Sequence, residues 1–212
     1  MKYIDTPRKK FLLFIPRDYA SSQKKKWPMI VFLHGVDERG DDLRIISDFA
    51  LTKQLNVMPD FPFFVVAPLC PLRTYWDRPR PAVMVKKIID DIGREFFIDE
   101  KRIYLTGLSM GGYGTWYIAS KYPDLFAAIV PLCGAANPEI AEKIKHIPAW
   151  VFHGVKDPIV SVRKSMDIVI ALKKAGHKFL RFTAYPHLEH DCWTETYANM
   201  SLYSWLLAQK KH

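Results

Sequence analysis

The sequence has few cysteines and no long hydrophobic run. Its three cysteines, Cys70, Cys133 and Cys192, are spread over 212 residues, and an odd, sparse set does not fit the disulfide framework of a small secreted protein. The apolar stretch at residues 11–15 is ended by Pro16 and is shorter than a signal-peptide core of roughly 7–15 residues. No run reaches the roughly 18 apolar residues of a transmembrane helix. The sequence therefore predicts a cytoplasmic protein with reduced thiols and no membrane insertion.

Low-complexity stretches and internal repeats are also absent. The composition, 49% hydrophobic and 25% charged, is typical of a soluble globular protein, and the length predicts a single domain over residues 1–212. The formal net charge of +9 would suit a nucleic-acid partner. The basic residues, however, form short scattered clusters without interleaved aromatic residues or a nucleic-acid motif. We therefore expect a solvated basic surface and no nucleic-acid partner.

Short apolar runs alternate with amphipathic segments along the chain. Continuous apolar runs such as residues 29–33 are typical of strands buried on both faces. The alternation predicts an α/β protein with a mostly parallel central sheet flanked by helices, and with the reacting groups at the carboxyl ends of the strands. The expected strands are 9–15, 27–33, 61–67, 102–105, 126–133, 148–153 and 178–185, and the expected helices are 41–55, 82–97, 110–122, 160–175 and 193–210.

The segment 103–116 contains the clearest chemical motif. Gly107, Ser109 and Gly111 form G-x-S-x-G between a strand-like and a helix-like stretch. In this nucleophile-elbow pattern, small residues two before and two after the serine let strand and helix approach closely. The hydroxyl is thereby lifted out of the sheet toward the unpaired N–H groups of a helix start, which favour negative charge. Because both flanks fit, we expect Ser109 to be a nucleophile rather than part of a helix-capping turn.

A serine nucleophile needs a base within hydrogen-bond reach and an acid that orients this base. Asp157 follows the strand expected at 148–153, and two histidines, His187 and His190, follow the last strand. Capping the next helix is the alternative role for Asp157. Asp167 and Asp191 are rivals by residue type only, because one lies within an expected helix and the other is adjacent to the histidine that it would have to orient.

These segments resemble serine esterases of the α/β-hydrolase superfamily, in the phospholipase/carboxylesterase and polyhydroxybutyrate-depolymerase-like group. The resemblance rests on residues 102–116, 126–134, 153–157 and 190–193 and extends from Lys10 to the final helix. It implies an α/β-hydrolase fold in which Ser109 is the nucleophile, Asp157 the orienting acid and His190 the general base. His190 precedes Asp-Cys-Trp, which fits the pattern of the group, whereas the residues after His187 do not.

The segment 34–40, His-Gly-Val-Asp-Glu-Arg-Gly, resembles the oxyanion loop of the same group. We expect the backbone N–H groups of Val36 and of Met110, the residue after the nucleophile, to stabilise the oxyanion. Charge pairing within residues 37–39 is expected to shape the loop. His34 and His153 each end an expected strand before a glycine, and we expect them to be hydrogen-bonded structural residues.

The region between the strands at 126–133 and 148–153 is too short for a lid domain, because only residues 135–146 separate them. The resulting open site favours small-molecule esters with short acyl groups over lipids. Trp76 and Trp193 are candidates for an aromatic wall that would suit aryl or hydroxycinnamoyl esters, and packing of the loops is their alternative role.

The leading interpretation is a carboxylic-ester hydrolase that works through an acyl-enzyme intermediate. We expect no metal and no organic cofactor, because no ligand-like cluster or phosphate-binding glycine loop is needed to explain the chain. A serine peptidase and an acyl-protein thioesterase on the same fold are alternatives, since all three share nucleophile, base and oxyanion hole. A catalytically silent binding protein is the alternative from another class. The sequence assigns no oligomeric state and no further role to the cysteines.

Overall fold

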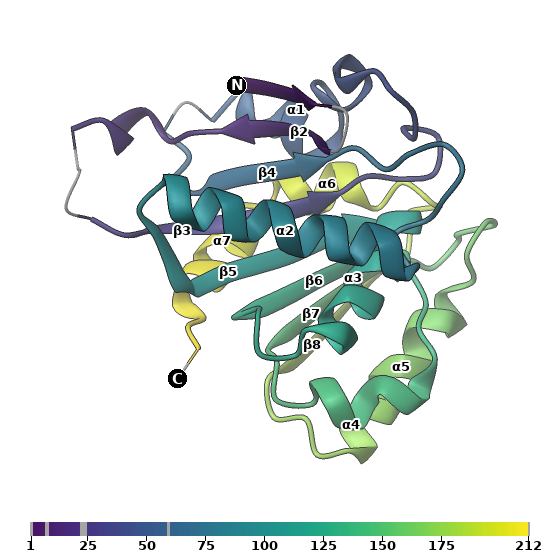
Figure 1. Cartoon of the computed structure of the whole chain (residues 1–212). Helices are drawn as coiled ribbons and strands as arrows, with labels where there is room; N and C mark the ends of the chain where they lie inside the picture. The colour runs from purple at the N-terminus through teal and green to yellow at the C-terminus, as the bar shows by residue number, and fades with distance from the viewer. Residues whose placement is uncertain (1, 7–8, 22–24, 59, 212) are drawn as a thin grey trace.

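The computed structural model describes residues 2–6, 9–21, 25–58 and 60–211 and is built around one eight-stranded sheet (Figure 1). The strand order is β1-β2-β4-β3-β5-β6-β7-β8. The strands are β1 (Lys2–Thr6), β2 (Lys9–Phe14), β3 (Trp27–Leu33), β4 (Phe64–Pro68), β5 (Ile98–Leu108), β6 (Ala128–Leu132), β7 (Ala149–Gly154) and β8 (Leu180–Tyr185).

The sheet is parallel from β4 through β8 in space, and only β1 and β2 run antiparallel to their neighbours. The predicted mostly parallel sheet is therefore confirmed. The strand β1 was not expected, because its charged and polar residues carry no apolar run and it lies at the edge of the sheet. Leu33 pairs with Gly107, and Leu108 pairs with Leu132. The carboxyl ends of β3, β5 and β6 consequently meet at one edge.

Helices cover both faces of the sheet (Figure 1). One apolar cluster joins the sheet to α2, α3 and α5, and a second joins it to α1, α6 and α7. Burial of these two clusters is the main force that holds the layers together. The helices are η1 (Arg17–Tyr19), η2 (Leu43–Ile46), α1 (Ala50–Leu55), α2 (Pro79–Glu95), α3 (Met110–Lys121), η3 (Pro138–Ile140), α4 (Ala141–Ile144), α5 (Val162–Lys174), α6 (Trp193–Ala198) and α7 (Met200–Ala208).

Two of the expected helices are interrupted in the structure. The region 41–55 contains the short 3-10 helix η2 and then α1, whose first residue, Ala50, has a φ of +49°. A continuous helix cannot pass through a residue in that conformation. The final helix breaks at Asn199, whose side chain accepts a hydrogen bond from the N–H of Ser201 and so caps α7. The backbone conformation of Ala50 and the capping by Asn199 therefore override the helical periodicity.

The region between β6 and β7 holds only η3 and α4, so no lid domain is inserted there. In the described part of the chain, no helix has both the length and the apolar composition to cross a membrane. The loops that follow β3, β5, β6, β7 and β8 all lie at the carboxyl edge of the parallel strands, and this edge holds the candidate site.

Candidate active site

Ser109 occupies a sharp turn between β5 and α3. Its backbone has a φ of +52° and a ψ of −117°, a conformation that is strained for a residue with a side chain. A Cβ on Gly107 would collide with the carbonyl group of Gly111, and a Cβ on Gly111 would collide with the carbonyl oxygen of Leu33. The two glycines are therefore required for the close backbone approach that holds the serine in this turn.

The hydroxyl of Ser109 lies within hydrogen-bond distance of His190. Ser109 Oγ is 2.9 Å from His190 Nε2, and His190 Nδ1 is 2.7 Å from Asp157 Oδ2. In the neutral imidazole, Nδ1–H donates to the carboxylate and Nε2 accepts from the serine hydroxyl. This is the geometry of a nucleophile, a base and an orienting acid. The three residues come from the turns after β5, β7 and β8.

The carboxylate of Asp157 is buried and fully engaged by hydrogen-bond donors. Oδ1 accepts from the N–H groups of Ile159 and Val160 at 2.8 and 2.9 Å, and His153 Nε2 lies 3.2 Å from Oδ2. Burial opposes ionisation of Asp157, but the hydrogen bonds from His190 and from these two N–H groups outweigh it and lower the pKa of the carboxyl. Asp157 therefore remains ionised next to His190.

The alternative residues do not reach this site. The exposed imidazole of His187 lies 3.1 Å from Glu195 on α6. Asp167 is exposed on α5, and Asp191 accepts hydrogen bonds from Thr194 at the start of α6. Asp157 accepts from the N–H groups of Ile159 and Val160 in its own loop, but it does not cap α5, because Ser161 is the N-cap residue of that helix.

Val36 and Met110, the residue after Ser109, border one pocket. Met110 is the first residue of α3, where a helix has no internal acceptor for its N–H groups. The pocket has a volume of about 340 Å³ and is also lined by Tyr75, Asp77, Arg78 and Tyr113. The two backbone N–H groups expected to stabilise an oxyanion thus belong to residues that line the same cavity.

A second pocket of about 320 Å³ adjoins the first along α3. The two share Asp77, Arg78 and Tyr113, and the second adds aromatic and small residues. Together they provide space on one side of the nucleophile for an ester of modest size. The additional lining residues are Trp116, Tyr117, Ser120, Ala135, Ala136, Asn137 and Ile140.

Cys133 and Cys192 are buried and interact with each other next to the turn that holds Ser109. Cys133, which follows β6, brings its Sγ to 3.3 Å from the N–H of Ser109, and its pKa is raised well above the usual value by burial and by Cys192. Among the described residues, one set of metal-ligand type has its ligand atoms within 4.8 Å of one another: Cys133, Asp157 and His190. Asp157 and His190 already bond to each other, and the thiol is held in its protonated form.

Comparison with known proteins agrees with this geometry. The sequence pattern of the phospholipase/carboxylesterase family matches residues 79–205, more than half of the chain. The chain belongs to this family. A thermostable esterase of known structure superposes with a TM-score of 0.86 at 37% identity, covering 99% of this chain and 62% of that one. The α/β-hydrolase fold and the resemblance to serine esterases are therefore confirmed.

Two further relatives carry esterase or depolymerase names. A bifunctional acetylxylan esterase/xylanase of Neocallimastix patriciarum is 30% identical over 125 residues, which is 57% of this chain and 17% of the relative. A poly(3-hydroxyalkanoate) depolymerase C of Paucimonas lemoignei is 40% identical over 53 residues, or 25% of this chain and 13% of the relative. The chain thus spans less than two thirds of the length of each of these three proteins.

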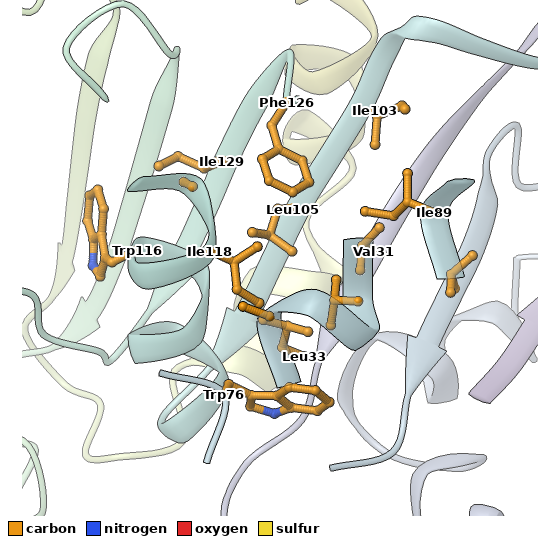
Figure 2. Close-up of a cluster of buried hydrophobic side chains, with 14 of the residues drawn as sticks. Val31, Leu33, Trp76, Ile89, Ile103, Leu105, Trp116, Ile118, Phe126 and Ile129 are labelled. Carbon is orange, nitrogen blue, oxygen red and sulfur yellow. The ribbon is translucent and has the colours of Figure 1, made fainter. Parts of the chain in front are cut away.

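The structure corrects the expected position of Trp76. Its side chain is fully buried, its Nε1–H donates to the carbonyl oxygen of His34 at 3.1 Å, and it lies beside Leu33 in the apolar cluster (Figure 2). The prediction of a substrate-contacting wall is wrong for Trp76, because the ring has no exposed surface. Trp193 is half-buried and lies perpendicular to the His190 ring at 5.4 Å between centroids, so its role as part of a wall stays a prediction.

The expected charge pairing within residues 37–39 is also wrong. Among the described residues Arg39 has no ion-pair partner, and its guanidinium donates to backbone carbonyl oxygens instead. Sequence reasoning also missed Tyr113 and Arg78, which line both pockets. Tyr113 had an available signal, because it lies four residues after Ser109, one helical turn along α3.

Proposed function

We propose that this member of the phospholipase/carboxylesterase family is a serine carboxylesterase that hydrolyses short-chain acyl or aryl esters. The observation that carries the proposal is the chain of contacts from Ser109 Oγ to His190 at 2.9 Å and from His190 to Asp157 at 2.7 Å. A serine with an oriented base is the arrangement that acyl transfer requires. In this proposal the whole chain, residues 1–212, works as one domain.

The reaction proceeds in two halves that use the same groups. In the first, His190 Nε2 accepts the hydroxyl proton while Ser109 Oγ attacks the carbonyl carbon, and the same proton then passes to the departing alcohol. The serine is left as an acyl ester. In the second half, His190 takes a proton from water, the hydroxide attacks the acyl-enzyme, and the proton returns to Ser109 as the carboxylic acid leaves.

Asp157 has an electrostatic role in both halves. When His190 becomes positively charged, the adjacent ionised carboxylate stabilises the imidazolium and keeps Nε2 directed at Ser109. The lowered pKa of Asp157 supports this role, because the group stays charged at the pH at which His190 works. Three donors converge on its two oxygens, which restricts the orientation of the carboxylate.

The oxyanion that forms at each attack needs preorganised donors. The N–H groups of Met110 and Val36 are proposed to supply them, because both residues line the pocket next to Ser109. Removing one such donor in related chemistry costs about 10²–10³ in kcat. No metal or organic cofactor takes part in any step of the proposed reaction.

The size of the site favours small esters. The two adjoining pockets have volumes of about 340 and 320 Å³, and the region between β6 and β7 contributes no lid. Tyr75, Tyr113 and the partly exposed Trp193 offer aromatic surface to an acyl or aryl group. Short acyl chains and single aromatic rings fit such a site, including a hydroxycinnamoyl group.

The test is a p-nitrophenyl ester series from acetate to palmitate, measured with the wild type, Ser109→Ala and the matched control Ser204→Ala on the exposed side of α7. We expect the highest kcat/KM on short esters and a loss of at least about 10⁴-fold in Ser109→Ala only. A rise in kcat/KM with chain length would indicate the acyl-protein thioesterase alternative. Cleavage of p-nitroanilide peptides in preference to esters would indicate a peptidase, and activity that survives in Ser109→Ala would refute the proposed nucleophile.

A further inference from the structure

Arg39 connects two loops that are distant in the sequence. Its Nε–H donates to the carbonyl oxygen of Val36 at 2.9 Å, and Nη1–H donates to those of Leu72 and Thr74 at 3.1 and 3.3 Å. The guanidinium also lies over the ring of Tyr75, 4.6 Å from its centroid. One side chain therefore ties the oxyanion loop (residues 34–40) to the rim loop (residues 69–78), which borders the first pocket.

The position of Val36 is not fixed by packing. Its side chain is 36% exposed, and the turn bond from the N–H of Arg39 to its carbonyl oxygen is long, at 3.4 Å. The shorter bond from Arg39 Nε to the same oxygen is therefore the firmer restraint on this peptide. This bond holds the planar peptide that joins Val36 to Asp37, whereas the Val36 N–H belongs to the preceding peptide, separated from it only by the φ and ψ rotations of Val36. Holding one peptide therefore limits how far the adjacent one, with the Val36 N–H, can move.

A guanidinium group is better suited than an ammonium group to hold the two loops together. Arginine presents N–H groups in a rigid planar fork and stacks on aromatic faces, whereas lysine is a flexible point charge. Here the fork reaches carbonyl oxygens on both loops while its plane contacts Tyr75. The far end of the oxyanion loop is tied separately, because the N–H of Gly40 donates to the carbonyl oxygen of Cys70 at 3.1 Å.

We propose that Arg39 is a positioning residue that holds the Val36 N–H where it stabilises the oxyanion, by clamping the oxyanion loop to the rim loop. The inference rests on the proposed esterase function and adds a residue to it. Arg39 touches no reacting atom, so its effect appears only when negative charge develops on the substrate. Loss of the clamp therefore slows acylation and deacylation together and leaves ground-state binding unchanged.

The experiment compares Arg39→Met and Arg39→Lys with the wild type on p-nitrophenyl acetate. Arg73→Met is the matched control, because it removes one exposed positive charge from the same rim loop. We expect kcat to fall roughly 10²-fold in Arg39→Met, toward the loss caused by removing an oxyanion donor, with KM within about twofold and Tm nearly unchanged. Arg39→Lys keeps the positive charge but lacks the planar guanidinium, so its kcat should exceed that of Arg39→Met by less than about tenfold.

A second measurement separates transition-state from ground-state effects. A boronic acid forms a tetrahedral adduct with the serine oxygen, and the affinity for it should fall in Arg39→Met by about the same factor as kcat. Arg73→Met should keep kcat and the boronate affinity within about twofold of wild type.

Several outcomes would overturn the inference. They are a kcat of Arg39→Met within threefold of wild type, an unchanged boronate affinity, and full recovery in Arg39→Lys, which would show that charge alone matters. A fall in Tm that accounts for the lost activity would likewise assign a merely structural role. Ser109→Ala keeps the two proposals apart: if it abolishes turnover while Arg39→Met does not impair it, the esterase proposal stands and the clamp fails.

Discussion

The nucleophile elbow and the oxyanion loop border the same pocket but are held in different ways. At the elbow, backbone packs against backbone: Gly107 and Gly111 leave no space for a Cβ, and the N–H of Ser109 donates to the carbonyl oxygen of Leu132 at 3.0 Å. In the oxyanion loop, side chains of the loop bind the backbone of a distant segment, as His34 and Arg39 do.

Because of this difference, we expect the elbow and the oxyanion loop to respond differently to substitution and to pH. The elbow depends on the absence of atoms, so any added side chain forces strand and helix apart. The oxyanion loop depends on the presence of particular polar groups, so its geometry responds to charge and pH as well as to substitution. We therefore expect substitutions at the elbow to have the larger effects.

The largest effect is expected from Gly111→Ala. The new Cβ would overlap the carbonyl oxygens of Leu33 and His34, and relief of that overlap requires β3 and α3 to separate. We expect the free energy of unfolding to fall by about 3 kcal/mol, measured by urea denaturation, and esterase activity to drop at least about 10²-fold. Gly93→Ala is the control, because a Cβ there, in the last turn of α2, meets no atom within 4 Å. It should raise stability by about 0.5–1 kcal/mol, and an equal result for both variants would contradict the comparison.

An intermediate effect is expected at His34, which is buried at the end of β3. Its Nδ1–H donates to the carbonyl oxygen of Gly35 at 2.7 Å, and Nε2 accepts from the N–H of Cys70 at 2.9 Å. Burial lowers the pKa of His34 to about 4. The neutral form is thus favoured in the folded state, and its stability contribution is complete above pH 6.5 and is lost as the pH falls toward 4.

The measurement for His34 is the free energy of unfolding between pH 7 and pH 4. A shift of this size in a buried group corresponds to about 3 kcal/mol of pH-dependent stability. His153 and His177, whose pKa values are also lowered by burial, add to the slope in the same direction. His34→Gln should therefore be less stable at pH 7 but have a shallower slope than the wild type. The exposed His187→Gln serves as control, and equal slopes for wild type and His34→Gln would contradict the assignment.

The elbow could be predicted from the sequence because its determinants are local. Gly107, Ser109 and Gly111 lie within five consecutive residues, and the fold that they imply is confirmed. The geometry also brings His190 and Asp157 to Ser109, and the roles assigned to them stay predictions until activity is measured. The parallel sheet explains why these residues meet, because parallel strands bring their carboxyl ends to one edge.

The supports of the oxyanion loop could not be predicted, because they depend on contacts across long stretches of chain. Trp76 lies in an irregular segment without periodicity, so nothing in the sequence indicated that its ring would be buried beneath His34. Arg39 has acidic neighbours in the sequence, which suggested ion pairs, but the rim loop offers it carbonyl oxygens instead. Every residue has a carbonyl group, so the sequence does not indicate which carbonyl oxygens accept hydrogen bonds from an arginine.

The smallest effect is expected at Glu38, a half-buried residue of the oxyanion loop. Burial raises the pKa of its carboxyl despite backbone hydrogen bonds from Glu38 and Gly35, and its Oε2 has no partner among the described residues. The protonated form is therefore favoured in the folded state, and its stability contribution is lost as the pH rises above about 4.5. Glu38→Gln, which cannot ionise, should raise Tm by about 2 °C at pH 8 and by less at pH 4. A Glu38→Gln variant that loses stability at pH 8 would show that the carboxylate is satisfied, and that the loop is as well packed as the elbow.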